Sequence, residues 1–284
     1  MKGTVVAELY RIGDLIGQGG MASVYEAEHL TLGIPVALKI LHGEATEEVR
    51  ERFAREAHAA SRLAHPNVVR VLDYGATESF QFIAMELLDG EPLATWLWRQ
   101  TEPPPLSDVR DIIVQVTEAI AAAHAAGVVH RDLKPENVFL VREGDGRRVA
   151  KVVDFGLAFI EGLGVDVTLT QPGTIAGTPY YMSPEQCRSL RVGPPADVYA
   201  LGCMLTELLQ LEPPFDGATP AEIMSRQMFA PAPPIARPSG AEAMPARLER
   251  LRLDALAKSE SSRPQSAAEF RDRLARAFEE ELTR

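Results

Sequence analysis

The segment His130-Arg131-Asp132-Leu133-Lys134-Pro135-Glu136-Asn137 combines an acid, a cation and an amide within eight residues, and it is the strongest signal in the chain. Asp132 can accept a proton from an alcohol, and Lys134 can neutralise a phosphoryl group in transfer. Asn137 offers an oxygen to a hard cation such as Mg²⁺. A polar loop after a helix is the ordinary interpretation of such a segment, but the motifs on either side argue against it. We therefore predict a phosphoryl-transfer site at residues 130–137.

A second acidic motif, Asp154-Phe155-Gly156, follows the apolar segment 149–153, which is typical of a strand. An isolated Asp-Phe-Gly is usually a turn. Here it lies downstream of residues 130–137, where Asp154 can supply a second oxygen ligand for magnesium. The order of the motifs therefore favours a metal-binding role for Asp154.

The glycine-rich segment 17–24 lies upstream, between two predicted strands. Glycines let a backbone approach phosphates and donate N–H groups to them. The segment is a weak signal by itself, because a glycine-rich hairpin is more often only a turn. In addition, Ala22 occupies the position of the third glycine in the usual pattern, which stiffens the loop.

Lys39 follows the apolar run 36–38 on the next predicted strand. A lysine on a strand is usually a solvated charge at the sheet edge. A lysine flanked by apolar residues needs an anionic partner, however. Glu56, in the helix predicted to come next, can supply that partner.

The first 86 residues indicate an antiparallel sheet with one helix. Alternation of apolar and polar residues between glycines predicts the strands. A run rich in Ala, Arg and Glu predicts the helix, which ends before Pro66 because the residue before a proline avoids helical geometry. The predicted elements are strands over 11–17, 23–30, 35–41, 68–74 and 80–86 and a helix over 47–63.

Helices are predicted to dominate from Pro92 onward. One of them has Ser107 as its expected N-cap and Gly127 as its stop. Capping boxes at Thr219 and Ser266 open two later helices. The segment 230–238, rich in proline and alanine, is predicted to be an extended connector rather than a docking ligand.

Charge and composition argue against several partners and locations. The net charge of −11 has the wrong sign for binding a phosphate backbone, so no nucleic acid partner is expected. The 2 cysteines lack metal-ligand spacing and suit a reducing compartment. No apolar stretch reaches the ~20 residues of a membrane span, and the N-terminus lacks a signal-peptide core. We expect a cytoplasmic chain, or the cytoplasmic domain of a membrane-anchored protein if the sequence is a fragment.

With these motifs in this order, the chain resembles a eukaryotic-type protein kinase of the bacterial serine/threonine subfamily, from about Tyr10 to Phe278. The resemblance implies an α+β fold with two lobes: residues 1–88 as a small antiparallel-sheet lobe with one helix, and residues 89–284 as a larger, mainly helical lobe. It implies transfer of the γ-phosphoryl group of ATP to serine or threonine hydroxyls of protein substrates. Mg²⁺ would be the cofactor, with Mn²⁺ as an alternative, and dimerisation is allowed.

The resemblance also implies a role for each site residue. Asp132 would be the catalytic base, and Lys134 would stabilise the γ-phosphate. Lys39, oriented by Glu56, would hold the α- and β-phosphates. The metal would be held by Asn137 and Asp154. The other nucleotide contacts would come from Ile16, Gly17, Gln18, Gly19, Gly20, Val24, Ala37, Met85, Glu86, Leu88 and Phe139.

Regulation is expected in the activation segment between Asp154 and Glu185. Because Arg131 precedes the catalytic aspartate, the chain resembles kinases whose activation segment is ordered by phosphorylation. Autophosphorylation is expected at Thr174 or Thr170. Thr178 would bridge Asp132 and Lys134 in the substrate-docking loop.

Three residues of the resemblance are expected to be structural supports. Glu185 would pair with Arg263, and Asp197 would anchor the segment 130–137. Ser183 stands where the family usually has alanine, a change of small expected consequence.

The sequence leaves two alternatives to a protein kinase function. An ATP-binding pseudokinase or scaffold module would keep the fold and lose a residue such as Lys39, Asp132 or Asn137, yet all of these and Asp154 are present. Only Ala22 favours that alternative. A kinase of small molecules usually lacks the activation segment and docking loop that this chain has.

Overall fold

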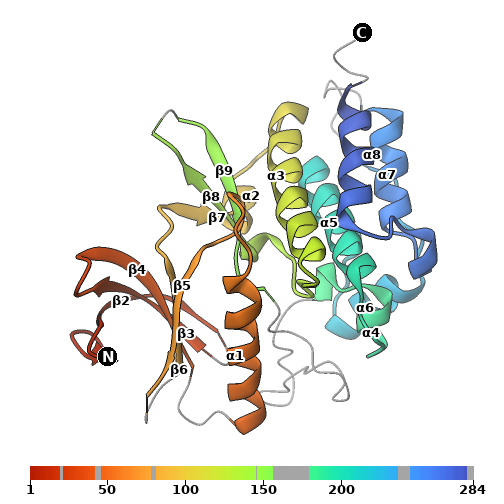
Figure 1. Cartoon of the computed structure of the whole chain (residues 1–284). Coiled ribbons are helices and arrows are strands. Elements are labelled where there is room, and N and C mark those ends of the chain that lie inside the picture. The colour runs from red at the N-terminus through yellow and green to blue at the C-terminus, as the bar shows by residue number, and fades with distance from the viewer. Residues whose placement is uncertain are drawn as a thin grey trace. The chain divides into compact units, whose positions relative to one another are not determined.

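The computed structural model describes residues 1–19, 22–41, 46–77, 81–144, 146–155, 179–235 and 244–279, apart from some side chains of the first long helix (Figure 1). The chain forms two compact units, Met1–Asp89 and Gly90–Arg284. No described helix combines the length and the apolar character that a membrane span requires.

The first unit is a six-stranded antiparallel sheet with one long helix, as the alternation pattern predicted. The strands lie in the order β1-β2-β3-β4-β6-β5, so β4 is flanked on both sides. Helix α1 contacts β5 and β6. The elements are β1 Val5–Val6, β2 Tyr10–Gln18, β3 Ala22–His29, β4 Ile34–Leu41, α1 Glu47–Ser61, β5 Val71–Ala76 and β6 Gln81–Glu86.

Most strand boundaries lie within one residue of the prediction, but the start of β5 and the presence of β1 differ from it. Strand β5 begins at Val71 rather than at residue 68, because Val68 donates its N–H to the carbonyl of His65 in a turn and pairing with β6 starts only at Val71. The two-residue strand β1 was not predicted, since two residues are too few to show a period. It pairs with the start of β2.

The core of the sheet centres on Tyr10 and Phe82, whose rings meet edge to face at 5.4 Å. The Tyr10 hydroxyl donates to Asp73 Oδ2 at 3.0 Å. Burial, together with that carboxylate, raises the pKa of Tyr10 above its usual range. Gly75 lies against the Phe82 ring, where an added Cβ would be 2.4 Å from Cζ. The packing therefore requires glycine at this point of β5.

The second unit is mainly helical and carries a small sheet of three strands in the order β7-β8-β9. Helix α3 packs against α8 and α5, and α5 packs against α7 (Figure 1). The six-stranded sheet of the first unit and the mainly helical second unit confirm the predicted α+β class. The elements are β7 Gly90–Pro92, α2 Leu93–Trp98, α3 Leu106–Ala125, η1 Pro135–Asn137, β8 Val138–Arg142, β9 Arg148–Val152, η2 Pro179–Tyr181, α4 Pro184–Cys187, α5 Pro194–Gln210, α6 Pro220–Phe229, α7 Ala246–Ala255, η3 Glu260–Ser262 and α8 Ala267–Glu279.

Helix α3 begins earlier than predicted. Pro105 is its N-cap residue and makes no side-chain capping bond, so the prediction of Ser107 as the cap was wrong. The reason is that the Pro105 carbonyl already accepts from the N–H groups of Asp108 and Val109. The prediction that this helix stops at Gly127 is confirmed. Gly127 has φ +75°, and the N–H of Val128 reaches back to the carbonyl of Ala123, which is the bonding of a Schellman motif.

Each of the two predicted capping boxes forms only one of its two expected hydrogen bonds. Thr219 Oγ1 accepts from the N–H of Glu222, and Ser266 Oγ accepts from the N–H of Glu269. The return bonds differ, because Glu222 accepts from the N–H of Ala218 and Glu269 from that of Gln265. Each glutamate therefore reaches one residue beyond the cap. The predicted connector has no helix or strand over its described part, 230–235.

Candidate active site

Asp197, in the first turn of α5, holds the backbone of the segment 130–137. Its two carboxylate oxygens accept the N–H groups of His130 and Arg131, each at 2.8 Å. His124 Nε2, at the end of α3, donates to Asp197 Oδ2 at 2.8 Å. The Asp197 side chain is 1% exposed, so these three donors replace the water that burial removes. The predicted anchoring of the segment by Asp197 is confirmed.

His130 connects this segment to the end of β9. Its buried ring lies 4.7 Å from the ring of Phe155. Nε2 donates to the carbonyl of Val153 at 3.0 Å, and Nδ1 accepts the N–H of Asp132 at 3.3 Å. Because a carbonyl can only accept and an N–H can only donate, these partners define the neutral ring with its proton on Nε2. His130 is therefore a structural link between the two acidic motifs.

Asp132, Lys134 and Asn137 form one hydrogen-bonded group. Oδ2 of Asp132 accepts from Lys134 Nζ at 2.7 Å and from Asn137 Nδ2 at 3.1 Å. Asn137 Nδ2 also donates to the Asp132 carbonyl at 2.8 Å. The Asp132 side chain is 39% exposed, and among the described residues its Oδ1 accepts no hydrogen bond. The hydrogen bonds at Oδ2 orient the carboxylate, and no described residue occupies Oδ1.

The same hydrogen bonds orient the Asn137 amide. Its NH₂ group is directed at Asp132, which leaves the amide oxygen for another ligand. The N–H of Val153 donates to the Asn137 carbonyl at 2.9 Å, so Asp154, the next residue, comes close to Asn137. Asp154 has φ +59°, a strained conformation that turns the chain at the end of β9. An amide oxygen and a carboxylate are ligands that suit a hard divalent cation.

Most of the predicted nucleotide-binding residues of the first unit lie on β2, β3, β4 and β6. Gly17 and Gln18 pair with Val24 and Ser23 at the ends of β2 and β3, and Gly19 donates its N–H to the carbonyl of Ala22 at 2.9 Å. The hairpin thus closes with Ala22 in place of glycine. Ile16, nearby on β2, is 51% exposed. Gly20 lies outside the described residues.

Lys39 is 4% exposed on β4 and lies directly opposite Val24 on β3. The side chain of Glu56 lies outside what the structure describes, so the pair of Lys39 with Glu56 stays a prediction. Ala37 is paired with Met85 across β4 and β6.

Of the remaining predicted nucleotide contacts, two belong to the first unit and one to the second. Glu86 ends β6, where its Oε1 accepts the N–H of Arg70 at 2.9 Å, and Leu88 follows it, half-buried. Phe139, in the second unit, lies on β8 opposite Pro92 and Lys151 and is also half-buried. The predicted regulatory residues Thr170, Thr174 and Thr178 lie outside the described residues.

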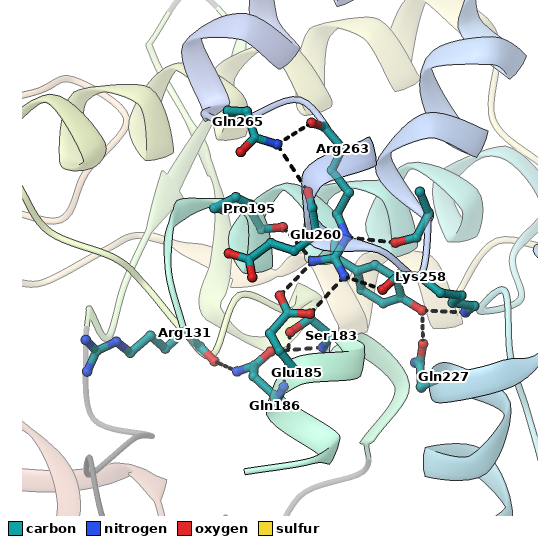
Figure 2. Close-up of polar contacts among 12 residues, drawn as sticks. Arg131, Ser183, Glu185, Gln186, Pro195, Gln227, Lys258, Glu260, Arg263 and Gln265 are labelled. Carbon is teal, nitrogen blue, oxygen red and sulfur yellow. Dashed lines mark hydrogen bonds and ion pairs between the residues drawn. The ribbon is translucent and has the colours of Figure 1, made fainter. Parts of the chain in front are cut away.

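Glu185 and Arg263 form the predicted ion pair through two hydrogen bonds of 2.7 and 2.8 Å (Figure 2). Arg263 also donates to the carbonyls of Ala257 and Pro195 and lies over the Tyr199 ring at 4.9 Å. Burial acts to raise the pKa of Glu185, but the hydrogen bonds and charge of Arg263 outweigh it, and the pKa lies below its usual value.

Two contacts of this region were not predicted. Ser183 and Gln186 form a complete capping box at the start of α4, and Gln186 Nε2 donates to the Arg131 carbonyl at 2.7 Å. The pattern Ser-x-x-Gln at 183–186 signals the box. The serine was predicted to be of small consequence, whereas it caps a helix that contacts the segment 130–137. No sequence pattern signals the second contact.

Known proteins resemble this chain over most of its length. A family model described as a protein kinase domain matches residues 10–272. Serine/threonine-protein kinase Pkn1 of Myxococcus xanthus is 40% identical over 276 residues, which are 96% of this chain and 39% of that protein. Serine/threonine-protein kinase PknB of Mycobacterium leprae is 35% identical over 278 residues, or 95% of this chain and 43% of that protein. The chain thus spans less than half the length of these two relatives.

A solved structure matches the fold of nearly the whole chain. The crystal structure of the Mycobacterium tuberculosis PknI kinase domain superposes with a TM-score of 0.72 and 29% sequence identity. The match covers 98% of this chain and 99% of that one.

Proposed function

Because this chain belongs to the protein kinase domain family, we propose that it transfers the γ-phosphoryl group of ATP to serine or threonine hydroxyls of protein substrates. The observation that carries the proposal is the hydrogen bonding of Asp132. Lys134 and Asn137 hold one carboxylate oxygen, and no described residue bonds to the other. The names of the relatives, which are serine/threonine-protein kinases, support the same choice of hydroxyl.

In the proposed reaction, Oδ1 of Asp132 accepts the proton of the substrate hydroxyl as its oxygen attacks the γ-phosphorus. The bond to the β,γ-bridging oxygen breaks, and ADP leaves. Lys134, 2.7 Å from the other carboxylate oxygen, supplies positive charge beside the transferring group. A divalent cation held by Asn137 and Asp154 would neutralise phosphate charge, and we propose Mg²⁺, with Mn²⁺ as an alternative.

The two compact units are proposed to be the lobes of one catalytic domain, divided near residue 88. Residues 16–20 of the first unit would cover the phosphates, and Lys39, supported by Glu56, would hold the α- and β-phosphates. The proposed adenine contacts are Val24, Ala37, Met85, Glu86, Leu88 and Phe139. Support comes from the burial of Lys39 on the strand that also carries Ala37.

Regulation by autophosphorylation is proposed at Thr174 or Thr170, with Arg131 as the partner of the new phosphate. Thr178 would contact Asp132 and Lys134. Mass spectrometry after incubation with ATP should find one of the two threonines modified. Full activity with both unmodified would contradict this part of the proposal.

We also propose a cytoplasmic location, because ATP is needed and Cys187 and Cys203 are free thiols. The pseudokinase alternative is not favoured, since Lys39, Asp132, Asn137 and Asp154 are all present.

The test of the proposed reaction is transfer of radiolabel from ATP to a generic basic protein. Asp132→Asn removes the proton acceptor and should slow transfer by roughly 10²- to 10⁴-fold, or about 3 to 5 kcal/mol of barrier. Asp272→Asn, in an exposed ion pair on α8, is the matched control and should behave as wild type. Equal transfer by wild type and Asp132→Asn would contradict the role of Asp132.

A further inference from the structure

The side chain of Gln186 joins α4 to the peptide that precedes the proposed base. Gln186 is 8% exposed, and both ends of its amide are used. Oε1 accepts the N–H of Ser183 at 2.9 Å, and Nε2 donates to the Arg131 carbonyl at 2.7 Å. In Figure 2 the Arg131 side chain points away from Gln186, so the contact is made by the backbone oxygen.

The peptide between Arg131 and Asp132 is held at both of its polar atoms. Its oxygen accepts from Gln186, and its N–H donates to His130 Nδ1 at 3.3 Å. Arg131 itself has φ +68°, in the left-handed region that non-glycine residues rarely adopt. Such a conformation persists only where surrounding contacts impose it. Asp197, which binds the Arg131 N–H, and Gln186 are two of those contacts.

We propose that Gln186 is a positioning residue for the proposed phosphoryl transfer, acting through the Arg131–Asp132 peptide on the carboxylate of Asp132. This inference rests on the proposed function. Rotation of that peptide moves the bond from Cα to Cβ of Asp132 and therefore displaces Oδ1. A displacement near 1 Å of a reacting group can cost about 100-fold in rate, so even a partial loss of this hydrogen bond should be visible in kcat.

Capping and positioning are carried by different atoms of the same motif. Ser183 Oγ accepts the Gln186 N–H at 3.4 Å, and this bond stabilises α4 without touching Arg131. The Gln186 amide nitrogen touches Arg131 and takes no part in the capping box. Substitutions can therefore remove one function and keep the other.

The decisive variant is Gln186→Glu. Glutamate has the same length and also closes a capping box, but it presents a carboxylate oxygen instead of an N–H to the Arg131 carbonyl. We expect kcat to fall by about 10-fold or more, while KM for ATP changes by less than about 2-fold. The melting temperature should fall as well, because the new carboxylate is buried against a carbonyl oxygen, so kcat is measured well below the unfolding transition. Gln186→Met is a second variant of similar volume.

Ser183→Ala is the matched control, because it removes the cap and keeps the amide at Arg131. It should lower the melting temperature and keep kcat within about 2-fold of wild type. Equal losses of kcat in Ser183→Ala and Gln186→Glu would make the role of Gln186 structural and overturn the proposal. A wild-type kcat in folded Gln186→Glu and Gln186→Met would overturn it as well.

A double substitution separates this inference from the proposed function. In the Asp132→Asn background, Gln186→Glu should reduce the residual rate much less than it does in wild type, because the group that it positions is already altered. Additive effects would contradict positioning through Asp132. If Asp132→Asn alone leaves the rate unchanged, the proposed function fails; if it slows transfer and Gln186→Glu does not, only this inference fails.

Discussion

Glu185 and Arg263 lie 78 positions apart in the sequence and meet in a buried ion pair, with Nη1 on Oε1 at 2.7 Å and Nη2 on Oε2 at 2.8 Å. The exposed fractions of the two side chains are 7% and 0%. The pair ties α4 to the turn that precedes α8, and Figure 2 shows that Arg263 also reaches the carbonyl of Pro195 at the start of α5.

Arg263→Met should destabilise the protein by about 3 to 5 kcal/mol, because it leaves the Glu185 carboxylate buried without its partner. Urea unfolding of the variant and wild type at neutral pH measures the difference. The double variant Glu185→Gln with Arg263→Met should recover part of it. Equal stability of wild type and Arg263→Met would contradict the contribution assigned to the pair.

The same pair predicts a pH dependence. The folded-state pKa of Glu185 lies below its ordinary value of 4.5, so the unfolded chain binds the proton more readily. The stabilisation is therefore present above about pH 4.5 and is lost as the pH falls through the folded pKa. Unfolding of wild type and Glu185→Gln between pH 7 and pH 3 should show a stability difference that shrinks toward acid. A difference independent of pH would contradict this assignment.

Asp197→Asn should weaken both stability and phosphoryl transfer. Asparagine has one acceptor oxygen where Asp197 uses two, so either the His130 or the Arg131 N–H loses its partner. The cost of one such buried group is about 1 to 3 kcal/mol. Urea unfolding and the transfer assay measure the two effects, and Asp216→Asn, on the surface near Tyr180, is a control of equal chemistry. Unchanged transfer by Asp197→Asn would show that residues 130–137 hold their geometry without this anchor.

Gly75→Ala should destabilise the first unit by about 1 to 3 kcal/mol, because the new Cβ would lie 2.4 Å from Cζ and 2.6 Å from Cε1 of the buried Phe82 ring. Gly144→Ala is the control, since nothing lies within 4 Å of a Cβ at that position. Thermal unfolding of both variants is the measurement. A wild-type melting temperature for Gly75→Ala would mean that the ring moves at little cost.

Lys258 predicts a change of stability in the alkaline range. Its Nζ lies 3.8 Å from the Phe215 ring centroid and donates to the Tyr199 hydroxyl at 3.0 Å. Burial is the main cause that lowers its pKa from 10.5 to about 8. Between these values the unfolded chain binds more protons at Lys258, so its contribution to the free energy of unfolding rises with pH.

The check is the difference in stability between wild type and Lys258→Met from pH 7 to pH 10. The difference is needed because Cys187, whose pKa burial raises to about 12, acts in the opposite direction in both proteins. We expect the free energy of unfolding of wild type to increase relative to that of the variant as the pH rises. A constant difference would place the pKa of Lys258 at its ordinary value.

The spacing of apolar residues within single segments made much of the fold predictable. The pattern over residues 11–41 predicted three strands of the first sheet. Burial alternates at the start of β2, whereas β4 is buried at every position from Val36 to Leu41. The stop at Gly127 was visible because only a residue that tolerates φ +75° ends a helix in this way. The start of α3 was missed because a polar Ser107 suggested a cap, while Pro105 supplies the first acceptor with its backbone.

Contacts between distant segments were predictable only where the family resemblance supplied them. The pair of Glu185 with Arg263 and the anchor at Asp197 came from that source. The bond of Gln186 to Arg131 joins residues 55 positions apart and follows no period. His124, which links Asp197 to the N–H of Ala267, gave no signal for the same reason.

The His124 contact sets an order of events during synthesis. Its Nδ1 accepts the N–H of Ala267, a residue 143 positions later, while Nε2 holds Asp197. A nascent chain that has not reached Ala267 lacks this bond, and one that has not reached Arg263 also leaves Glu185 unpaired. Because a chain emerges from the ribosome N-terminus first, the segment that carries Asp132 gains these two supports only after Arg263 and Ala267 have been made. The N-terminal part of a growing polypeptide therefore lacks these contacts with residues 78 and 143 positions downstream until those residues emerge.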